Sequence, residues 1–290
     1  MKSIIYVLIA VFTISIIYTA LPNSLVQKRQ TITIQTTDKQ ANSDQLKASA
    51  KIIEKRLKDY GIITGKSIID DNAGTIEFQV KGDNLTQEIS YLLLAKGSID
   101  LYETHNRNEA IDVLKSNADL MQLLEIPQGE KAPEEYSSII GFCQPENKEA
   151  TNKLIHNISQ KTGMNVKFLW SGAPYFEGKY VLHIAQNTPA INKTYFEHTE
   201  VIKDKPSGAF QLNITFNNDG IDLWSDITKS NIGKNITITL DDRVLSSPKV
   251  MAQIKEGRAM ISGKFSENDL KLISALANNI DLPISFKIKK

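Results

Sequence analysis

The densest group of reactive side chains lies in one short stretch, which reads TLDDRVLSSPKVMAQIKEGRAMISGKF. Under a catalytic interpretation, Ser246 or Ser247 would be a nucleophile, because a hydroxyl beside a base can attack a carbonyl. Lys249 would be that base, and Asp241 or Asp242 would supply the acid. A lysine base must be desolvated, however, and this lysine follows a proline in a polar segment.

Turn formation explains the same residues without catalysis. Asp241 and Asp242 follow the β-rich run ITITL, and aspartate favours turns because its carboxylate accepts hydrogen bonds from nearby amides. Arg243 would continue the next strand, and Ser247-Pro248 would break it, since proline fixes φ and lacks an N–H. We favour the turn interpretation and predict no catalytic residue. The hydrolase built on Ser247 and Lys249 remains the least favoured alternative.

The rest of the chain offers little other reactive chemistry. The four histidines are far apart in sequence, and none forms a metal-binding pattern with cysteine or carboxylate; they are His105, His156, His183 and His198. We expect His183 to lie on a strand surface, and we expect the single cysteine, Cys143, to be a buried apolar residue. No glycine-rich phosphate loop or dinucleotide pattern is present. The sequence therefore predicts no metal and no cofactor.

Charge and the amino terminus limit the partners. A formal net charge of +1 leaves no broad basic field for nucleic acid, so we predict no nucleic-acid partner.

The run Ile4–Leu21 carries no charged residue, and its length is close to the roughly 17–25 residues of a membrane helix. A cleaved signal peptide is the alternative, but cleavage after Ala20 would put Tyr18 where a small residue is required. We predict an uncleaved membrane anchor.

The segment after the anchor alternates strands and helices. Strands are expected at 31–37, 66–69, 75–80 and 98–104, and helices at 43–61 and 85–95. We expect Ser43 to cap the first helix and Gly61 to end it. The order βαββαβ predicts a ferredoxin-like layer, with one sheet and two helices on one face.

The periodic pattern of apolar and polar residues weakens after the first subdomain and returns near residue 208. Helices are expected at 108–124 and 147–163, within a stretch from 105 to about 181 that shows few periodic features. Strands at 208–216 and 234–240 then alternate with helices at 217–231 and 266–279. The fold class is therefore α+β. We divide the chain into a membrane anchor (1–25), a base-like βαββαβ subdomain (26–104) and a head-like α+β domain (105–290).

An ordered set of motifs within 208–283 is the most specific feature of the sequence. The stretches FNNDG, SDIT, NIGKNITITLDDRVLSSPKV, IKEGRAMISGKFS and DLP follow one another in this order. Together they resemble the first periplasmic domain of the SecD/SecDF family, which assists the bacterial Sec protein-export machinery. The motif positions, for which the resemblance implies structural or client-contact roles, are Phe216, Asn217, Gly220, Thr228, Asn231, Gly233, Lys234, Asp241, Ser247, Pro248, Gly257, Gly263, Phe265 and Pro283.

The resemblance has limits. The Asp-Leu-x-Gly-Gly motif that the family carries after its first helix is absent, and residues 105–180 match no part of the family pattern. The sequence given stops at Lys290, whereas the family continues into further membrane helices, where ionisable residues couple export to the proton gradient. The resemblance therefore implies a module that lacks a proton-conducting membrane bundle of its own.

The sequence supports one function and one alternative. We expect a non-enzymatic SecD-like module, held on the outer face of the bacterial inner membrane by Ile4–Leu21, that contacts translocating polypeptide non-covalently. Its implied partners are Sec translocon components or the exported polypeptide. The alternative is a membrane-anchored binding or scaffold protein that reuses the head fold for another client. In that case the unmatched 105–180 segment would carry specificity.

Overall fold

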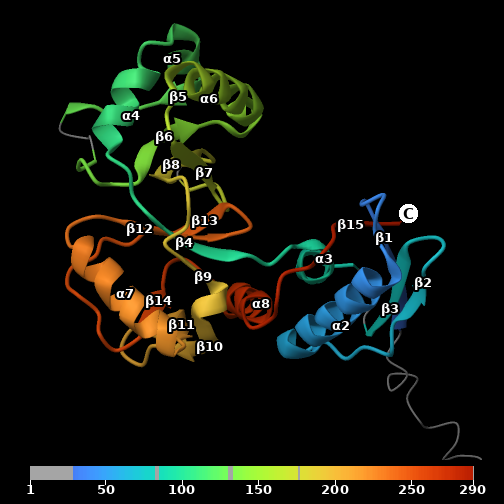
Figure 1. Ribbon diagram of the computed structural model, residues 1–290. Helices are drawn as coiled ribbons and strands as arrows, with labels where there is room; N and C mark the ends of the chain where they lie inside the picture. Colours follow the sequence, from blue (N-terminus) through green and yellow to red (C-terminus); the bar gives the residue numbers. More distant parts are fainter. Residues whose placement is uncertain (1–28, 82–84, 130–132, 176, 290) are drawn as a thin grey trace, which may run out of the picture.

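The computed structural model describes residues 29–81, 85–129, 133–175 and 177–289 (Figure 1). The predicted anchor, Ile4–Leu21, lies outside the described residues, and so does the whole of the predicted segment 1–25. Within the described ranges, every helix is too short or too polar to cross a bilayer.

A four-stranded antiparallel sheet forms the part of the molecule that we call the base. Its strands lie in the order β15 (Phe286–Ile288), β1 (Arg29–Thr36), β3 (Thr75–Lys81), β2 (Ile68–Asp70). Two helices accompany it, α2 (Ser43–Tyr60) and α3 (Gln87–Leu94). Helix α2 is capped by Asn42, one residue before the predicted cap, and it ends at Gly61 as predicted.

The predicted βαββαβ layer is wrong in its last strand. Residues 99–103 do form a strand, β4 (Ile99–Glu103), but it pairs with strands of another sheet. Buried side chains occur on both faces of β4, which suits an internal strand of a larger sheet. The fourth place in the base sheet is taken by β15, whose edge position leaves Lys287 exposed. The chain thus leaves the base after α3 and returns to it at the last described strand.

The largest sheet joins the remaining parts of the molecule. Its eight strands lie in the order β5 (Leu124–Glu125), β6 (Ile139–Cys143), β8 (Tyr180–Gln186), β7 (Val166–Ser171), β13 (Arg243–Ser246), β12 (Ile236–Leu240), β4, β9 (Ile191–Asn192). Strands β7 and β13 are parallel, and the other pairs are antiparallel. Strand β4 contacts β8 although three strands separate them in this order, so the sheet curls. Tyr102, Leu169, Ala185 and Val244 fill the space inside the curl.

Residues 105–186 form what we call the upper lobe, at the top of Figure 1. Helices α4 (Arg107–Leu114), α5 (Ala118–Leu123) and α6 (Lys148–Thr162) pack with strands β5 to β8 around a separate apolar core. The single helix predicted at 108–124 is therefore two helices. The break occurs where the Asn117 side chain accepts a hydrogen bond from the Leu120 amide and starts a new helix. Cys143 is buried, as predicted.

Residues 187–284 form what we call the motif lobe, which contains all of the motif positions. A three-stranded sheet, in the order β10 (Phe196–Lys203), β11 (Phe210–Phe216), β14 (Arg258–Ile261), packs with α7 (Asn218–Ser230) and α8 (Glu267–Ala277). The strands predicted at 208–216 and 234–240 and the helices predicted at 217–231 and 266–279 are confirmed as β11, β12, α7 and α8. Helix α8 also contacts α2 and α3, so the motif lobe and the base share one hydrophobic core.

Candidate functional site

The Asp-Asp pair forms the tight turn that the sequence predicts. Asp241 and Asp242 link β12 to β13, and both have positive φ values, 47° and 61°. A two-residue hairpin turn with two left-handed residues matches the twist of the strands that it joins, and aspartate tolerates this conformation better than most residues. The Asp241 carboxylate accepts hydrogen bonds from the amides of Gly97 at 2.9 Å and Ser98 at 2.7 Å. The turn therefore ties β12 to the loop that follows α3.

A group of buried and half-buried charges surrounds this loop, and we call it the charged joint. Its members are Arg56 from the base, and Lys193 and Asp241 from the motif lobe. The Arg56 guanidinium is fully buried and donates hydrogen bonds to the carbonyls of Ala95 at 2.7 Å and Lys96 at 2.6 Å. Burial lowers the pKa of Arg56 to about 10, so the side chain stays charged at neutral pH.

Lys193 completes the charged joint from the side of the motif lobe. Its ammonium donates to the Gly97 carbonyl at 2.6 Å and forms an ion pair with Asp281 at 2.6 Å. Gly97 has a φ of 84°, and a Cβ added there would lie 2.5 Å from a terminal nitrogen of Arg56. The backbone at residue 97 therefore needs glycine for two reasons, its conformation and the close approach of the guanidinium.

The serine and lysine of the catalytic interpretation do not meet. The Lys249 ammonium forms its ion pair with Glu134 of the upper lobe. The Ser247 hydroxyl is hydrogen-bonded to Ser138 at 2.8 Å and to Thr237 at 2.9 Å. The two residues thus point to different partners, and a nucleophile–base hydrogen bond between them is missing from the described contacts.

Ser247 instead belongs to a chain of neutral polar groups that we call the hydroxyl joint. It runs from Thr237 of β12 through Ser247 and Ser138 to His183 of β8, where Ser138 Oγ lies 2.8 Å from His183 Nδ1. Ser138 and Thr237 are fully buried, and His183 is 7% exposed, so the prediction that His183 lies on a strand surface is wrong. Burial lowers the pKa of His183 to about 4, and the ring is neutral at pH 7. The hydroxyl joint connects the upper lobe to the motif lobe.

Several motif residues shape the ends of α7. Asn217 accepts a hydrogen bond from the Gly220 amide and caps the helix. A Cβ on Gly220 would lie 2.7 Å from the Tyr195 carbonyl oxygen, so only glycine fits there. Thr228 and Asn231 are buried near the other end, where the Thr228 hydroxyl accepts the Ile254 amide and Asn231 donates to Glu103 of β4 at 2.5 Å.

The remaining motif residues form turns or packing contacts, or are exposed. The amide of Gly233 donates to Val250, and the ammonium of Lys234 lies 4.6 Å from the centre of the Tyr136 ring. The buried Phe216 ring packs edge-to-face against Phe196 and lies tilted against Trp224. Gly257 and Gly263 have positive φ values and lie against Ile221 and Phe265, while Pro248 and Pro283 are exposed. The structure gives direct evidence of packing and turn formation at these positions, and their role in client contact stays a prediction.

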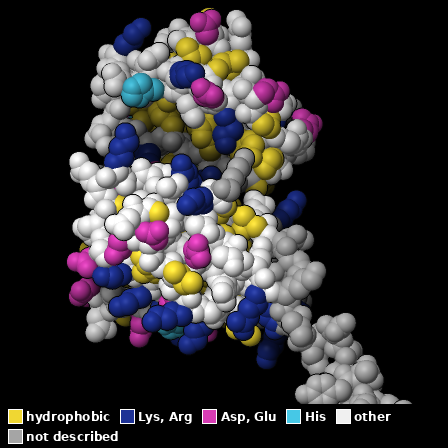
Figure 2. All heavy atoms as spheres, turned by 90° about the vertical axis from the view of Figure 1, so that its right-hand side faces the viewer, with side chains coloured by type: hydrophobic (Ala, Val, Ile, Leu, Met, Phe, Trp, Pro, Cys, Tyr) yellow, Lys and Arg dark blue, Asp and Glu magenta, His cyan; other side chains and the backbone are white. Residues whose placement is uncertain are grey.

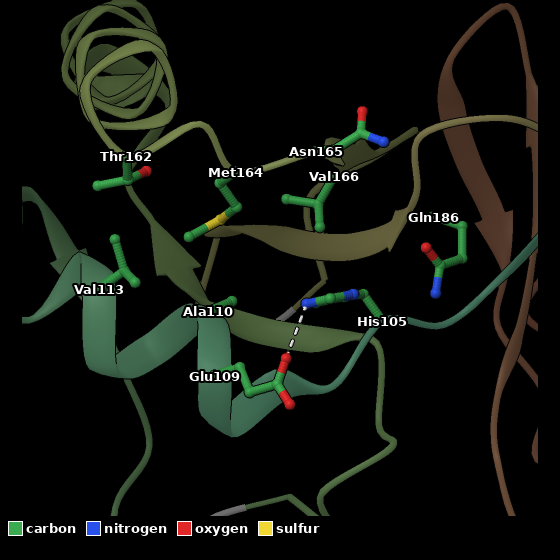
Figure 3. A pocket seen from close by; sticks show the side chains of 9 residues that line it. All are labelled: His105, Glu109, Ala110, Val113, Thr162, Met164, Asn165, Val166 and Gln186. Carbon is green, nitrogen blue, oxygen red and sulfur yellow. Dashed lines mark ion pairs between the residues drawn. The ribbon is translucent and has the colours of Figure 1, made fainter.

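A pocket of about 330 Å³ opens in the upper lobe, in a region that the sequence analysis did not interpret (Figure 3). Helix α4 supplies the apolar side chains of Ala110 and Val113, and the segment before β7 and its first residue supply those of Met164 and Val166. The polar border includes Thr162, Asn165 and Gln186. His105 and Glu109 form an ion pair of 3.4 Å at this border. The volume lies at the lower end of the range for small-ligand sites, and the mixed lining suits an apolar group with polar atoms beside it.

Apolar side chains and cations also lie close together on one face of the molecule. Figure 2 shows a hollow in the upper part of the molecule, with hydrophobic side chains inside it and lysine or arginine side chains around it. Cations also lie over aromatic rings in the upper lobe, where the Lys148 ammonium is 3.7 Å from the centre of the Tyr180 ring and 5.2 Å from that of Trp170. Among the described residues, no three His, Cys, Asp or Glu side chains gather as they would around a metal ion.

Sequence reasoning missed Arg56, Lys193, Ser138 and the burial of His183. A signal existed for Arg56, because it stands three residues after Ile53 on the apolar stripe of its helix. No comparable signal marked Lys193 or Ser138, since both lie in short connecting segments whose partners are distant in sequence.

Comparisons with known proteins agree with the motif pattern. The family model described as SecDF, P1 head subdomain, matches residues 174–283. The protein translocase subunit SecD of Endomicrobium trichonymphae is 37% identical over 82 residues, which are 28% of this chain and 17% of that protein. The SecD subunit of Rickettsia bellii is 26% identical over 181 residues, or 61% of this chain and 33% of that protein. The chain thus spans a third or less of the length of these two curated relatives.

The fold is also similar to a solved structure, described as that of a membrane component SecDF that enhances protein export. The match has a TM-score of 0.52 at 17% identity and covers 90% of this chain and 98% of that one. The SecDF structure in a super-membrane-facing form gives the same TM-score at 16% identity, over 90% of this chain and 30% of that one. The predicted resemblance to the SecD/SecDF family is therefore confirmed for the head segment.

Proposed function

We propose that this chain, whose residues 174–283 match the SecDF P1 head subdomain, assists Sec-dependent protein export by binding translocating polypeptide reversibly and without covalent chemistry. The observation that carries the proposal is that head match, which includes every one of the predicted motif positions. The fold similarity to a SecDF structure over 90% of the chain supports it. Exported chains share no fixed sequence, so a contact surface built for main-chain atoms and generic apolar side chains suits them.

The proposal includes a position for the chain. Residues Ile4–Leu21 anchor it in the bacterial inner membrane with the described residues on the outer side, in the arrangement of a base and a head. Strand β4 then belongs to the head and β15 to the base. The charged joint would then hold the base to the motif lobe, and the upper lobe would be presented to the client. We propose no catalytic role, because the Lys249 ammonium binds Glu134 while Ser247 binds two other hydroxyls.

Site-specific photo-crosslinking tests the proposal. A photoreactive residue is placed at exposed positions of each part, for example Lys66 of the base, Gln186 of the upper lobe and Met251 of the motif lobe. The full chain is then expressed with a reporter precursor that is arrested during export. We expect crosslinks to the precursor or to translocon subunits from at least one part. The same reporter expressed without an export signal is the control.

Absence of such crosslinks from every part, in cells where the chain is present and folded, would contradict the proposal. Deletion of the gene should also slow export of the reporter, and re-expression of the full chain should restore the rate. Unchanged export kinetics together with absent crosslinks would overturn the assignment to protein export.

A second candidate is a binding or scaffold protein that reuses the head fold for a different client. It is favoured by one observation, that residues 105–173 lie outside the family match and supply most of the separate apolar core of the upper lobe. For this candidate, crosslinks would form with a folded partner rather than with the arrested precursor. Crosslinks from Gln186 would then persist when export is blocked.

A further inference from the structure

We infer that the open side of strand β7, beside the upper-lobe pocket, binds an extended polypeptide segment as an added strand and takes one of its apolar side chains into the pocket. The inference rests on the proposed function, since it names how a client of no fixed sequence would be held. Main-chain hydrogen bonds give such binding its affinity, and a side-chain pocket gives it a preference.

Strand β7 is paired along only part of its length. On one side it pairs with β8 from Val166 to Trp170. On the other side its neighbour is β13, and the register there includes only Trp170 and Ser171. The residues from Val166 to Leu169 therefore have no strand partner on the β13 side among the described strands.

The backbone N–H and C=O groups of Val166 and Phe168 point away from β8, toward the side of β13. The amide of Ile184 in β8 donates to the Ser138 carbonyl at 2.7 Å, on the side of β6. Ile184 therefore turns its N–H and C=O away from β7, and its partner in the register, Phe168, must turn its own away from β8. Val166 lies two residues from Phe168 and has the same orientation. Two donors and two acceptors are thus available at strand spacing, and an extended backbone supplies their complement.

The hairpin turn of the motif lobe creates this opening. Strand β13 runs parallel to β7, and Arg243 is its first residue, placed opposite Trp170. A longer β13 would cover the rest of β7, but the chain reverses at Asp241 and Asp242 to pair with β12. The Asp242 carboxylate forms an ion pair with Lys167, which fixes the turn beside β7. The same turn that the motif specifies therefore leaves the first part of β7 free.

The pocket lies at the start of the open stretch. Val166 belongs both to the open stretch and to the pocket lining, so a strand added there would run past the pocket mouth. The lining from Ala110, Val113 and Met164 is apolar, and a methionine adapts to side chains of different shape. We therefore assign the pocket to a medium-sized apolar side chain of the bound segment, such as leucine, isoleucine or methionine.

In the motif lobe, side chains form hydrogen bonds with the outward backbone groups of two edge strands. The side-chain amide of Asn278 accepts the Thr199 N–H at 2.7 Å and donates to the Thr199 carbonyl at 2.9 Å, which blocks the outer edge of β10. The Arg258 carbonyl on the edge strand β14 accepts the Trp224 indole N–H at 3.0 Å. The described side-chain hydrogen bonds include no such cover for Val166 or Phe168.

The test uses the full chain and a fluorescent synthetic heptapeptide in which leucine alternates with threonine. Binding is measured by fluorescence anisotropy. A peptide of the same sequence with every amide N-methylated has no backbone N–H to donate from either edge. We expect the methylated peptide to bind at least about fivefold more weakly, since each net hydrogen bond contributes about 1 kcal/mol. Equal binding of the two peptides to the wild-type chain would overturn the inference without any variant.

A matched pair of variants tests the same edge from the protein side. Val166→Pro removes the outward N–H at the first residue of the strand, where proline is tolerated, and keeps the β7–β8 ladder bonds. Val166→Ala shortens the same side chain but keeps the N–H. We expect binding to fall about fivefold for V166P and less than about threefold for V166A. Equal effects of the two variants, with both folded by circular dichroism, would contradict strand addition.

Photo-crosslinking separates this inference from the proposed function. A photoreactive residue at Asn165 lies beside the open stretch, whereas one at Lys229 lies on α7 of the motif lobe. Crosslinks of the arrested precursor to Asn165, weakened by Val166→Pro, are the expected result. Precursor crosslinks at other positions without any at Asn165 would overturn the strand-addition site and leave the proposed function standing. Absence of crosslinks everywhere would count against both.

Discussion

The charged joint and the hydroxyl joint connect neighbouring parts of one molecule with opposite chemistry. The charged joint holds the base to the motif lobe through Arg56, Lys193 and Asp241, whose charges are met by backbone groups and by Asp281. The hydroxyl joint holds the upper lobe to the motif lobe through neutral groups that end at a buried histidine. Arg56 of the charged joint stays charged at neutral pH, whereas the hydroxyl joint loses its neutral form when His183 is protonated.

This difference indicates where the molecule is held most firmly. Removing one member of a buried charged group leaves its partners unsatisfied in a medium of low polarity, which is costly. Removing one hydroxyl from a neutral chain costs less, because the group that loses its partner carries no charge. We therefore expect the base and the motif lobe to unfold together, and we expect the attachment of the upper lobe to respond to mild changes of sequence or pH.

The largest effect is expected at Arg56 of the charged joint. Arg56→Ala removes the donors for the carbonyls of Ala95, Lys96 and Ile280 and leaves a cavity between the base and the motif lobe. We expect a loss of about 4 kcal/mol in the free energy of unfolding, measured by urea denaturation. Lys55→Ala, one residue earlier on the exposed face of the same helix, is the control and should cost less than about 1 kcal/mol. Similar costs for the two variants would show that the charged joint does not hold these parts together.

The next largest effect is the pH dependence of the hydroxyl joint. Burial holds the pKa of His183 at about 4 in the folded state, below the 6.5 of a free histidine. The unfolded state therefore binds a proton first, and the free energy of unfolding falls as the pH decreases from about 6.5. The loss levels off below about pH 4 at roughly 3 kcal/mol, because each pKa unit corresponds to 1.36 kcal/mol.

Urea denaturation at a series of pH values measures this loss, and His183→Asn isolates it. Asparagine has no titration in this range, so the wild-type chain should lose about 3 kcal/mol more than the variant between pH 6.5 and pH 4. Carboxylates titrate in both proteins and cancel in the difference. Parallel pH curves for the two proteins would mean that His183 is accessible to protons in the folded state.

A smaller effect separates the two aspartates of the hairpin turn. Both residues have positive φ, so alanine at either position carries the same backbone strain. Asp241→Ala also loses the hydrogen bonds from the amides of Gly97 and Ser98, whereas Asp242→Ala loses only an ion pair to Lys167 in which the aspartate is largely exposed. We expect D241A to be less stable than D242A by about 2 kcal/mol in thermal or urea unfolding. Equal stabilities would mean that the charged joint does not depend on the carboxylate of Asp241.

The sequence predicted the local structure around these joints better than the contacts between residues that are far apart in the chain. The turn at Asp241-Asp242 and the helices α7 and α8 follow from residue preferences within a few positions, and they were predicted correctly. The position of β4 was not, because its apolar pattern is compatible with either sheet and only its distant partner, β12, decides between them. Contacts such as Ser138 with His183 join residues 45 positions apart, and no local pattern specifies such a pair. The open side of β7 was missed for the same reason, since it depends on where β13 begins relative to β7. The pocket was missed because its lining joins residues between 105 and 186 that only the folded lobe brings together.

The smallest effect lies within the pair of serines that first suggested catalysis. The Ser247 hydroxyl has two partners in the hydroxyl joint, whereas the buried Ser246 hydroxyl has none among the described residues. Ser247→Ala should therefore cost about 1 kcal/mol in the free energy of unfolding, and Ser246→Ala should be neutral or slightly stabilising, because it removes a buried polar group without a partner. Urea denaturation at pH 7 measures both.

Chemical labelling of the two serines distinguishes a structural role in the hydroxyl joint from the catalytic interpretation. A serine-reactive fluorophosphonate should label neither residue of the folded chain, since the Lys249 ammonium is paired with Glu134 and gives Ser247 no base. Labelling that is lost in Ser247→Ala but retained in Ser246→Ala would restore the hydrolase. A stability cost at Ser247 without labelling instead makes this hydroxyl a connection between lobes. Because His183 lies at the other end of the same chain of hydroxyls, that cost should be smaller below pH 4, where protonation has already weakened the joint.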